Sequence, residues 1–177
     1  YHYRIFATNA LGNSATSTTV NDLAGDDPDS VTGLTGVALD EARIKLDWVE
    51  PGANAYPISG YKIEVSLDNT NWTTVVADTN TTSVTYTHTG LTTVTDYYHR
   101  VSAINGLGIG NASTVVQTTT MGVPDAITTL GGTAAVNSIN DQRSDITLTW
   151  TAPTANGSTI SHYTVQVLDT DGVTWLT

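Results

Sequence analysis

Hydrophobic and polar residues alternate with a period of two along much of the chain, which is the pattern of half-buried β-strands. Ile44, Leu46 and Trp48 fall on one face of their segment, and the same alternation places Leu67 and Val84 inward. Strands are predicted over residues 1–7, 34–39, 43–49, 58–67, 72–77 and 83–89, with polar turns between them. No segment keeps the helical period over three turns. The pattern therefore predicts an all-β sandwich or barrel.

The chain repeats itself at a shift of 96 residues, and this repeat sets the size of the structural unit. Tyr1–Val20 aligns with Tyr97–Val116, and nine of the twenty aligned residues are identical. A third copy follows, in which Trp150 corresponds to Trp48. We expect the last two strands of one domain plus a linker in residues 1–27, a complete domain in residues 28–120, and a linker plus the first half of a third domain in residues 121–177.

Three motifs of this repeat resemble the fibronectin type III family, namely LDWVEP, ISGYKIEV and GLTTVTDYYHRVSAIN. The resemblance implies tandem seven-stranded immunoglobulin-like β-sandwiches, of which the first and the last are incomplete in this chain. It also implies a structural core of Trp48, Tyr61, Leu91 and Tyr97, in which Tyr97 is the tyrosine of the corner. The Asn-x-x-Gly turn and the Thr-rich, Cys-free composition look most like copies in prokaryotic cell-surface and extracellular proteins.

The sequence departs from the family pattern at three residues. Thr93 stands where the family has the Pro of the corner, and His88 and His99 occupy inward positions that the family usually fills with aliphatic side chains. If the two imidazoles lie together, burial and mutual repulsion lower their pKa values, so acid should destabilise the domain. In the alternative interpretation both are neutral and each bonds a neighbouring hydroxyl or carbonyl group. Tyr3 stands at the His99 position in the first copy, so the effect would belong to the second domain.

The composition opposes several classes of partner. A net charge of −11 disfavours nucleic acid, whose phosphates attract Lys and Arg, and also an anionic membrane surface. No apolar run approaches the ~20 residues of a membrane-spanning helix, and the chain contains no Cys. The resemblance to cell-surface copies of the family implies an extracellular or cell-surface location, which the absence of Cys does not exclude. The expected partners are other copies of the chain or neighbouring surface proteins, with no nucleic acid and no membrane insertion in this stretch.

Three acidic residues of the first linker, Asp26, Asp27 and Asp29, form a candidate calcium site. Ca²⁺ binds roughly six to eight oxygen atoms, and carboxylates supply them readily. The sequence Asp-Thr-Asp-Gly at residues 169–172 also resembles part of a calcium loop. A polar linker and a hairpin turn explain both stretches without a metal, and the second linker, residues 121–123, lacks the acids. No other cofactor is predicted.

Surface chemistry with carbohydrate is considered in two forms. Asn-x-Ser/Thr triplets that could accept N-linked glycans are headed by Asn71, Asn80, Asn111 and Asn156. A chain so rich in Ser and Thr yields roughly three such triplets by chance, so their number is no sign of selection. Trp72 and Trp175 recur at matching positions. An exposed indole there could stack on a sugar or, in the alternative interpretation, cover the flank of the sandwich.

No catalytic arrangement is visible, so the chain is predicted not to be an enzyme. A glycosidase needs two carboxylates at one site, and a catalytic triad needs a nucleophile beside a positioned His. The acids here lie in predicted turns, and the loop 105–111 lacks the Arg-Gly-Asp that some fibronectin domains carry there. We expect a structural or interaction module, namely a spacer, stalk or packing unit of a surface layer, filament or large adhesin. The alternatives are an accessory region of a secreted polysaccharide-degrading enzyme and a ligand-binding adhesin.

Overall fold

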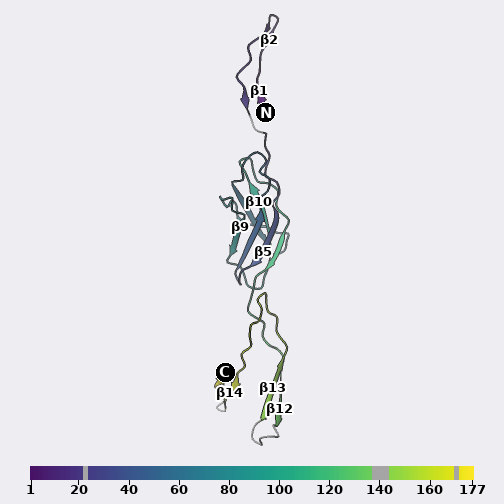
Figure 1. Cartoon of the computed structure of the whole chain (residues 1–177), viewed down its shortest axis with the longest axis vertical. Helices are drawn as coiled ribbons and strands as arrows, with labels where there is room; N and C mark the ends of the chain where they lie inside the picture. The colour runs from purple at the N-terminus through teal and green to yellow at the C-terminus, as the bar shows by residue number, and fades with distance from the viewer. Residues whose placement is uncertain (22–23, 137–143, 170–171) are drawn as a thin grey trace. The chain divides into compact units, whose positions relative to one another are not determined.

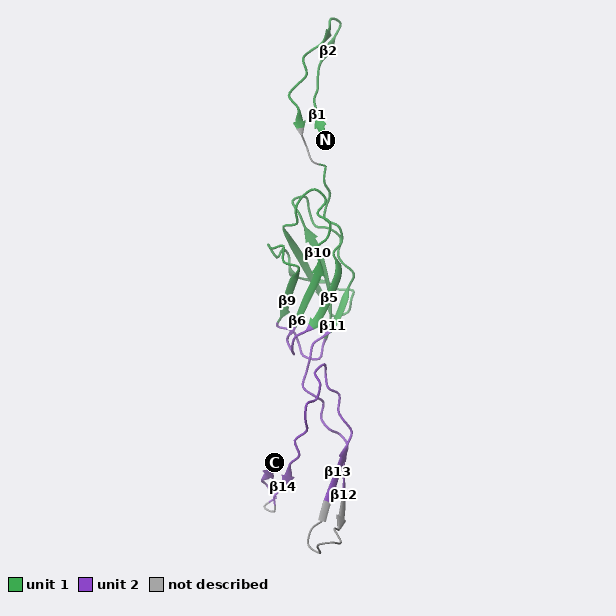
Figure 2. Ribbon diagram, viewed as in Figure 1, with its two compact units in different colours: residues 1–37, 44–89, 96–118 green, residues 38–43, 90–95, 119–177 purple. Residues whose placement is uncertain are grey.

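The structure is a computed structural model that describes residues 1–21, 24–136, 144–169 and 172–177. This part of the chain is all β, with no helix and therefore none long and apolar enough to cross a lipid bilayer. The chain divides into two compact units, which Figure 2 colours separately. Unit 1 comprises residues 1–37, 44–89 and 96–118, and unit 2 comprises residues 38–43, 90–95 and 119–177. The all-β prediction is confirmed.

Seven strands in two sheets build the complete sandwich (Figure 1). The three-stranded sheet has the order β5-β6-β9, with the bounds Thr32–Ala38, Arg43–Val49 and Thr85–Thr89. The four-stranded sheet has the order β11-β10-β7-β8, with the bounds Val116–Thr119, Asp96–Ile104, Gly60–Ser66 and Thr73–Val76. Strand β6 coincides with the predicted strand 43–49, because its side chains alternate most regularly between buried and exposed.

Apolar side chains from facing strands fill the space between the two sheets. Ile44, Leu46 and Trp48 alternate along β6 and are buried, and Tyr61 and Ile63 of β7 are buried opposite them. The rings of Trp48 and Tyr61 meet edge to face, with centroids 5.0 Å apart and planes at 68°. This arrangement suits the ring quadrupoles and adds to the burial of apolar area. The aromatic pair therefore joins the two sheets at the centre of the core.

Three apolar side chains are more exposed than the sequence pattern predicts. Leu91, expected among the most buried residues, is half-buried because it lies in the loop between β9 and β10 and not within a strand. Leu67 is 66% exposed because β7 ends at Ser66 and a polar turn follows. Val84 is 37% exposed because β9 begins one residue later. The alternation of a strand therefore predicts burial only inside its hydrogen-bonded length.

Outside the complete sandwich, the described strands form antiparallel pairs. The first copy has β1 (His2–Tyr3) with β4 (Val20–Asn21) and β2 (Thr8–Asn9) with β3 (Gly12–Asn13). The third copy has β12 (Leu130–Val136) with β13 (Ser144–Trp150) and β14 (Val167–Leu168) with β15 (Trp175–Leu176). Trp150 meets Tyr163 edge to face at 5.2 Å, so the aromatic core pair of the complete sandwich recurs in the third copy.

Candidate functional site

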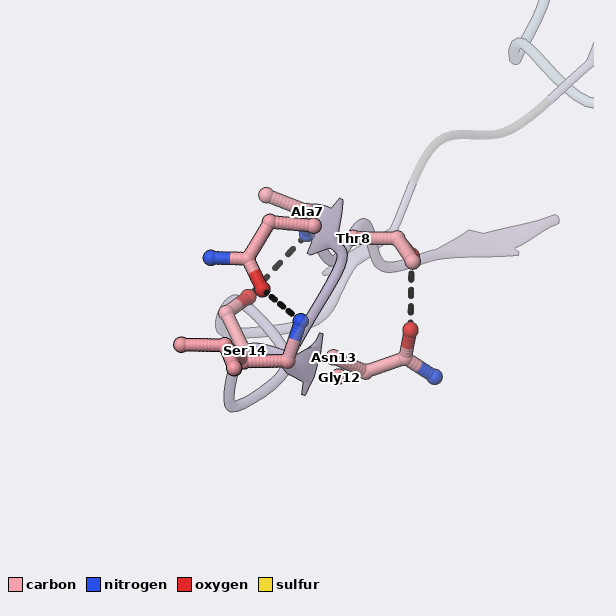
Figure 3. Close-up of a pocket in the computed structure, with 7 residues that line it drawn as sticks. Ala7, Thr8, Gly12, Asn13 and Ser14 are labelled. Carbon is pink, nitrogen blue, oxygen red and sulfur yellow. Dashed lines mark hydrogen bonds between the residues drawn. The ribbon is translucent and has the colours of Figure 1, made fainter.

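A depression of about 290 Å³ lies in the hairpin of the first copy (Figure 3). Its lining residues are Ala7, Thr8, Asn9, Leu11, Gly12, Asn13 and Ser14. The amide of Ser14 donates to the carbonyl of Ala7 at 2.8 Å, and the hydroxyl of Thr8 donates to Oδ1 of Asn13 at 2.6 Å. All the lining residues are exposed, and their polar groups bond one another. The depression is therefore the inside of a hydrogen-bonded turn, and it presents no buried polar group to a ligand.

The side chain of Asn54 holds the polar linker that precedes the complete sandwich. Its Nδ2 donates to the carbonyl of Asp27 at 2.7 Å and to Oδ1 of Asp29 at 3.1 Å. Two backbone bonds run beside it, from the amide of Asp29 to the carbonyl of Gly52 at 3.0 Å and from the amide of Asp26 to the carbonyl of Asn54 at 3.3 Å. We refer to these four hydrogen bonds as the linker clasp. They tie the linker to the loop between β6 and β7.

The linker clasp recurs in the third copy around Asn156. Its Nδ2 donates to the carbonyl of Val123 at 2.8 Å and to Oδ1 of Asp125 at 2.9 Å. The amide of Asp125 donates to the carbonyl of Thr154 at 3.0 Å, and the amide of Gly122 donates to the carbonyl of Asn156 at 2.8 Å. Each of the four bonds has its counterpart in the first clasp. The two linkers share Asp29 and Asp125 but otherwise differ in sequence, so the shared elements are the asparagine, the aspartate that it bonds and the backbone around them.

Local backbone geometry explains why both clasps use asparagine. The φ angle is 51° at Asn54 and 50° at Asn156, in the left-handed region that most side chains avoid. Asparagine tolerates this region because its short polar side chain can bond nearby backbone groups. Hydrogen bonds from the side chains of Asn156 and then Thr154 lower the pKa of Asp125, so its carboxylate stays ionised at the second clasp.

A second asparagine, Asn105, holds the first linker from the loop between β10 and β11. Asn105 is buried, and its Nδ2 donates to the carbonyls of Asp26 at 2.9 Å and Ala53 at 3.1 Å. Its Oδ1 accepts from the amides of Leu107 at 2.9 Å and Gly108 at 3.1 Å. The side-chain amide of Asn105 thus bonds both the linker and its own loop. Its nitrogen and its oxygen are both hydrogen-bonded, as buried polar atoms require.

The family model for the fibronectin type III domain matches residues 29–119, the span of the complete sandwich. This chain belongs to the fibronectin type III family. Titin from Drosophila melanogaster is 34% identical over 116 residues, which are 62% of this chain and 1% of titin. A crystal structure of titin domains superposes with a TM-score of 0.54 at 26% identity, covering 67% of this chain and 40% of that one.

A second solved structure shows the same fold. The FN1–FN3 domains of chicken CNTN1 superpose with a TM-score of 0.50 at 24% identity, covering 70% of this chain and 41% of that one. The expected likeness to prokaryotic surface proteins receives no support from the titin relative, which comes from Drosophila melanogaster. These comparisons therefore show the fibronectin type III family and its fold.

Within unit 2, the loop before β10 holds the start of the second linker. The hydroxyl of Thr93 donates to the carbonyl of Met121 at 2.8 Å, and the amide of Met121 donates to the carbonyl of Asp40 at 3.1 Å. The neighbouring Val94 has φ of 48°, a strained value for a β-branched residue. The sequence marked Thr93 only as a departure from the fibronectin type III pattern. The hydroxyl group of Thr93, in place of the Pro that the family has there, is the sequence feature that could have indicated this contact.

Two acids of the first linker accept hydrogen bonds from within the chain. Among the described residues, no three His, Asp or Glu side chains form a group that could hold a metal ion. The carboxylate of Asp29 accepts from Asn54, and Oδ1 of Asp26 accepts from the amide of Asp27 at 2.9 Å. The other calcium-like stretch, residues 169–172, lies partly outside the described residues, because 170 and 171 are not among them.

The asparagines of the four glycosylation triplets differ in how their amides are engaged. Asn71 and Asn80 are exposed, and the Nδ2 of Asn71 donates to Oδ2 of Asp68 at 2.6 Å. Asn111 is exposed in the loop before β11. Asn156 is half-buried, and both of its described Nδ2 contacts belong to the linker clasp. A glycan on Asn156 would therefore require the second clasp to open, whereas the other three acceptors leave both clasps intact.

A charged residue covers the indole of Trp72. The guanidinium carbon of Arg100 lies 4.2 Å from the centre of the ring, within the range of a cation–π contact. Glu64 binds Arg100 at 2.8 Å and Lys62 at 2.7 Å. Burial alone would raise the pKa of Glu64, but the bonds to Arg100 and Lys62 outweigh it and lower the pKa. Trp72 therefore packs on its own sheet, while its counterpart Trp175 is 61% exposed.

Proposed function

We propose that this chain is a structural and interaction module of an extracellular or cell-surface assembly, in which it serves as a spacer, stalk or packing unit and performs no catalysis. The recurring linker clasp carries the proposal, since the same four hydrogen bonds surround Asn54 and Asn156. A flexible connector leaves its backbone free, whereas a clasped connector is bonded to the domain that follows it. A linker clasp that recurs along the chain suits a spacer or stalk, because it bonds each linker to the domain that follows.

The proposed domain layout follows the repeat. Residues 1–27 supply the last two strands of one domain and a linker, residues 28–120 form a complete domain, and residues 121–177 supply a second linker and the first half of a third domain. Each clasp supports this layout because it joins a linker to the loop that follows the second strand of the next copy. The similar titin structure also contains several consecutive domains, which supports a tandem arrangement.

The proposed partners are other copies of this chain or neighbouring surface proteins. The net charge of −11 disfavours phosphate-rich partners. The described residues include no group of three His, Asp or Glu side chains that could hold a metal ion, and the ring nitrogens of His88 and His99 face each other between the sheets. Most of the polar side chains described above form hydrogen bonds or ion pairs within the chain itself, rather than facing a site for a small ligand. This distribution favours a structural role.

Protease treatment of intact cells of the source organism tests the proposed location. We expect the polypeptide that contains this chain to be cleaved on intact cells, and antibodies against residues 28–120 to label their surface, while a cytosolic marker stays protected. Labelling that appears only after lysis would show that the location is wrong. Isolation of the same polypeptide with a polysaccharide hydrolase domain attached would favour the accessory-region alternative over a stalk or packing unit.

A further inference from the structure

Two histidines face each other across the interior of the complete sandwich. His88 lies on β9 of the three-stranded sheet, and His99 lies on β10 of the four-stranded sheet. Nδ1 of His88 is 2.9 Å from Nε2 of His99, and the rings meet at 87°. His99 is fully buried and His88 is half-buried. The pair is thus a hydrogen-bonded contact between the two sheets.

The hydrogen bond between the two imidazole rings depends on how many protons the rings carry. A neutral imidazole has one N–H donor and one bare nitrogen acceptor, so two neutral rings can share one hydrogen bond. When both rings are protonated, every nitrogen carries a hydrogen, and the facing nitrogens repel each other. The other nitrogen of His99, Nδ1, is buried without a hydrogen-bond partner in the described structure. A second proton on the His99 ring places an N–H on both of its nitrogens, and the N–H at Nδ1 then meets no acceptor and no solvent.

Among the described residues, no carboxylate contributes to the electrostatics of either imidazole, so none compensates a positive charge there. Tyr97, beside both rings with centroids 6.4 Å away, is the titratable side chain in ring contact with them. Glu64 of β7 and Arg100 of β10 are one residue from the inward positions on their strands, so they point to the outer face and bind each other. Lys45 and Asp47 of β6 likewise alternate with inward residues and form their own ion pair at 3.0 Å.

We propose that the His88–His99 pair is an acid-sensitive contact between the two sheets, which holds the complete domain closed at neutral pH and weakens it as the pH falls. Burial and then the charge of His88 lower the pKa of His99 to about 4, and burial lowers the pKa of His88. The unfolded chain, with His near its ordinary value of about 6.5, therefore binds more protons than the folded domain below that pH. Stability is full above about pH 6.5 and falls as the pH approaches 4.

Urea unfolding of the full chain at pH 7.5 and pH 5, followed through the buried amide signals of Ile63 and Val101, tests the proposal. We expect the unfolding equilibrium constant of the wild type to rise at least about tenfold from pH 7.5 to pH 5, because unfolding frees His99 to take up a proton that the folded domain excludes at pH 5. The double variant His88→Val with His99→Val should change less than about threefold. His162→Gln, which removes an exposed His, should behave like the wild type. An equal change in wild type and double variant would overturn the proposal.

A second measurement needs no variant. The imidazole carbon-bound protons of the wild-type chain report the titration of each histidine by nuclear magnetic resonance. One ring, His99, should stay neutral down to about pH 4. The carboxylates of Asp40, Asp47 and Glu64 have lowered pKa values and titrate near or below about pH 4.5, so they do not interfere near pH 6.5, where an ordinary histidine titrates. Titration of both rings of the pair at the ordinary value of about 6.5 would contradict the proposal.

Discussion

Replacing Trp48 by Ala is expected to destabilise the complete domain by about 3–5 kcal/mol, the range for removal of a buried aromatic side chain. The indole is 5% exposed and meets Tyr61 edge to face between the two sheets, so its loss leaves a cavity that neither sheet can close by moving alone. Such a loss is a large part of the ~5–15 kcal/mol that stabilises a typical domain. Urea unfolding of the full chain, followed through the amide of Ile63, measures it.

The matched control for this prediction is Trp72→Ala. Trp72 is half-buried on the outer side of the same domain, where Arg100 lies over its ring. Its removal gives up a partly exposed cation–π contact, and we expect a cost of only about 1 kcal/mol. If both tryptophan variants lost the same stability, or if Trp48→Ala left the unfolding midpoint unchanged, the assignment of Trp48 to the core between the sheets would be wrong.

Gly110→Ala is expected to loosen the first linker and to cost about 1–3 kcal/mol, the range for overpacking. A Cβ added at Gly110 would collide with the backbone carbonyl of Pro28. Neither side can yield easily, because the amide of Gly110 donates to the carbonyl of Ala103 at 2.9 Å and the ring of Pro28 fixes its own φ. The linker must therefore move away from the loop, and the clasp bonds beside it must lengthen. Chemical denaturation of the full chain gives the magnitude.

Gly106→Ala is the control for Gly110→Ala, because it adds the same methyl group to the same loop. The new Cβ at Gly106 would lie 3.4 Å from the ring of Tyr56, an ordinary van der Waals contact. We expect this variant to stay within about 0.5 kcal/mol of the wild type, as for a surface substitution that breaks no special feature. Equal losses in the two variants would show that the loop, and not its contact with the linker, determines the stability measured.

The sequence predicted the sandwich well where strand alternation and burial agree. Strand β6 coincides with the predicted segment because Ile44, Leu46 and Trp48 each need the interior. The prediction failed at Leu91 and Leu67, which are apolar but lie beyond the ends of strands. Apolar character alone does not tell where a strand stops, since turns are set by side chain–backbone bonds that the periodicity does not contain.

The linker clasp was not predicted, although its parts were visible. Asp29 recurs as Asp125 in the sequence, but Asp29 was considered only as a metal ligand or a linker acid. The matching asparagines, Asn54 and Asn156, stand three residues after equivalent prolines in the two copies. What the sequence could not provide is the left-handed φ of both asparagines, which turns each side chain toward the preceding linker. Such a contact between distant loops becomes visible only in three dimensions.

Backbone ¹⁵N relaxation at the linker amides of Asp29 and Asp125 tests the central claim, that each domain holds its own linker. If the clasps form, both order parameters should lie near about 0.85, the value of rigid backbone. Asn54→Ala should lower the value at Asp29 and leave Asp125 unchanged. Asn80→Ala should change neither, because Asn80 has the same φ of 51° and bonds only within its own turn. Order parameters below about 0.6 at both linkers of the wild type would contradict the account.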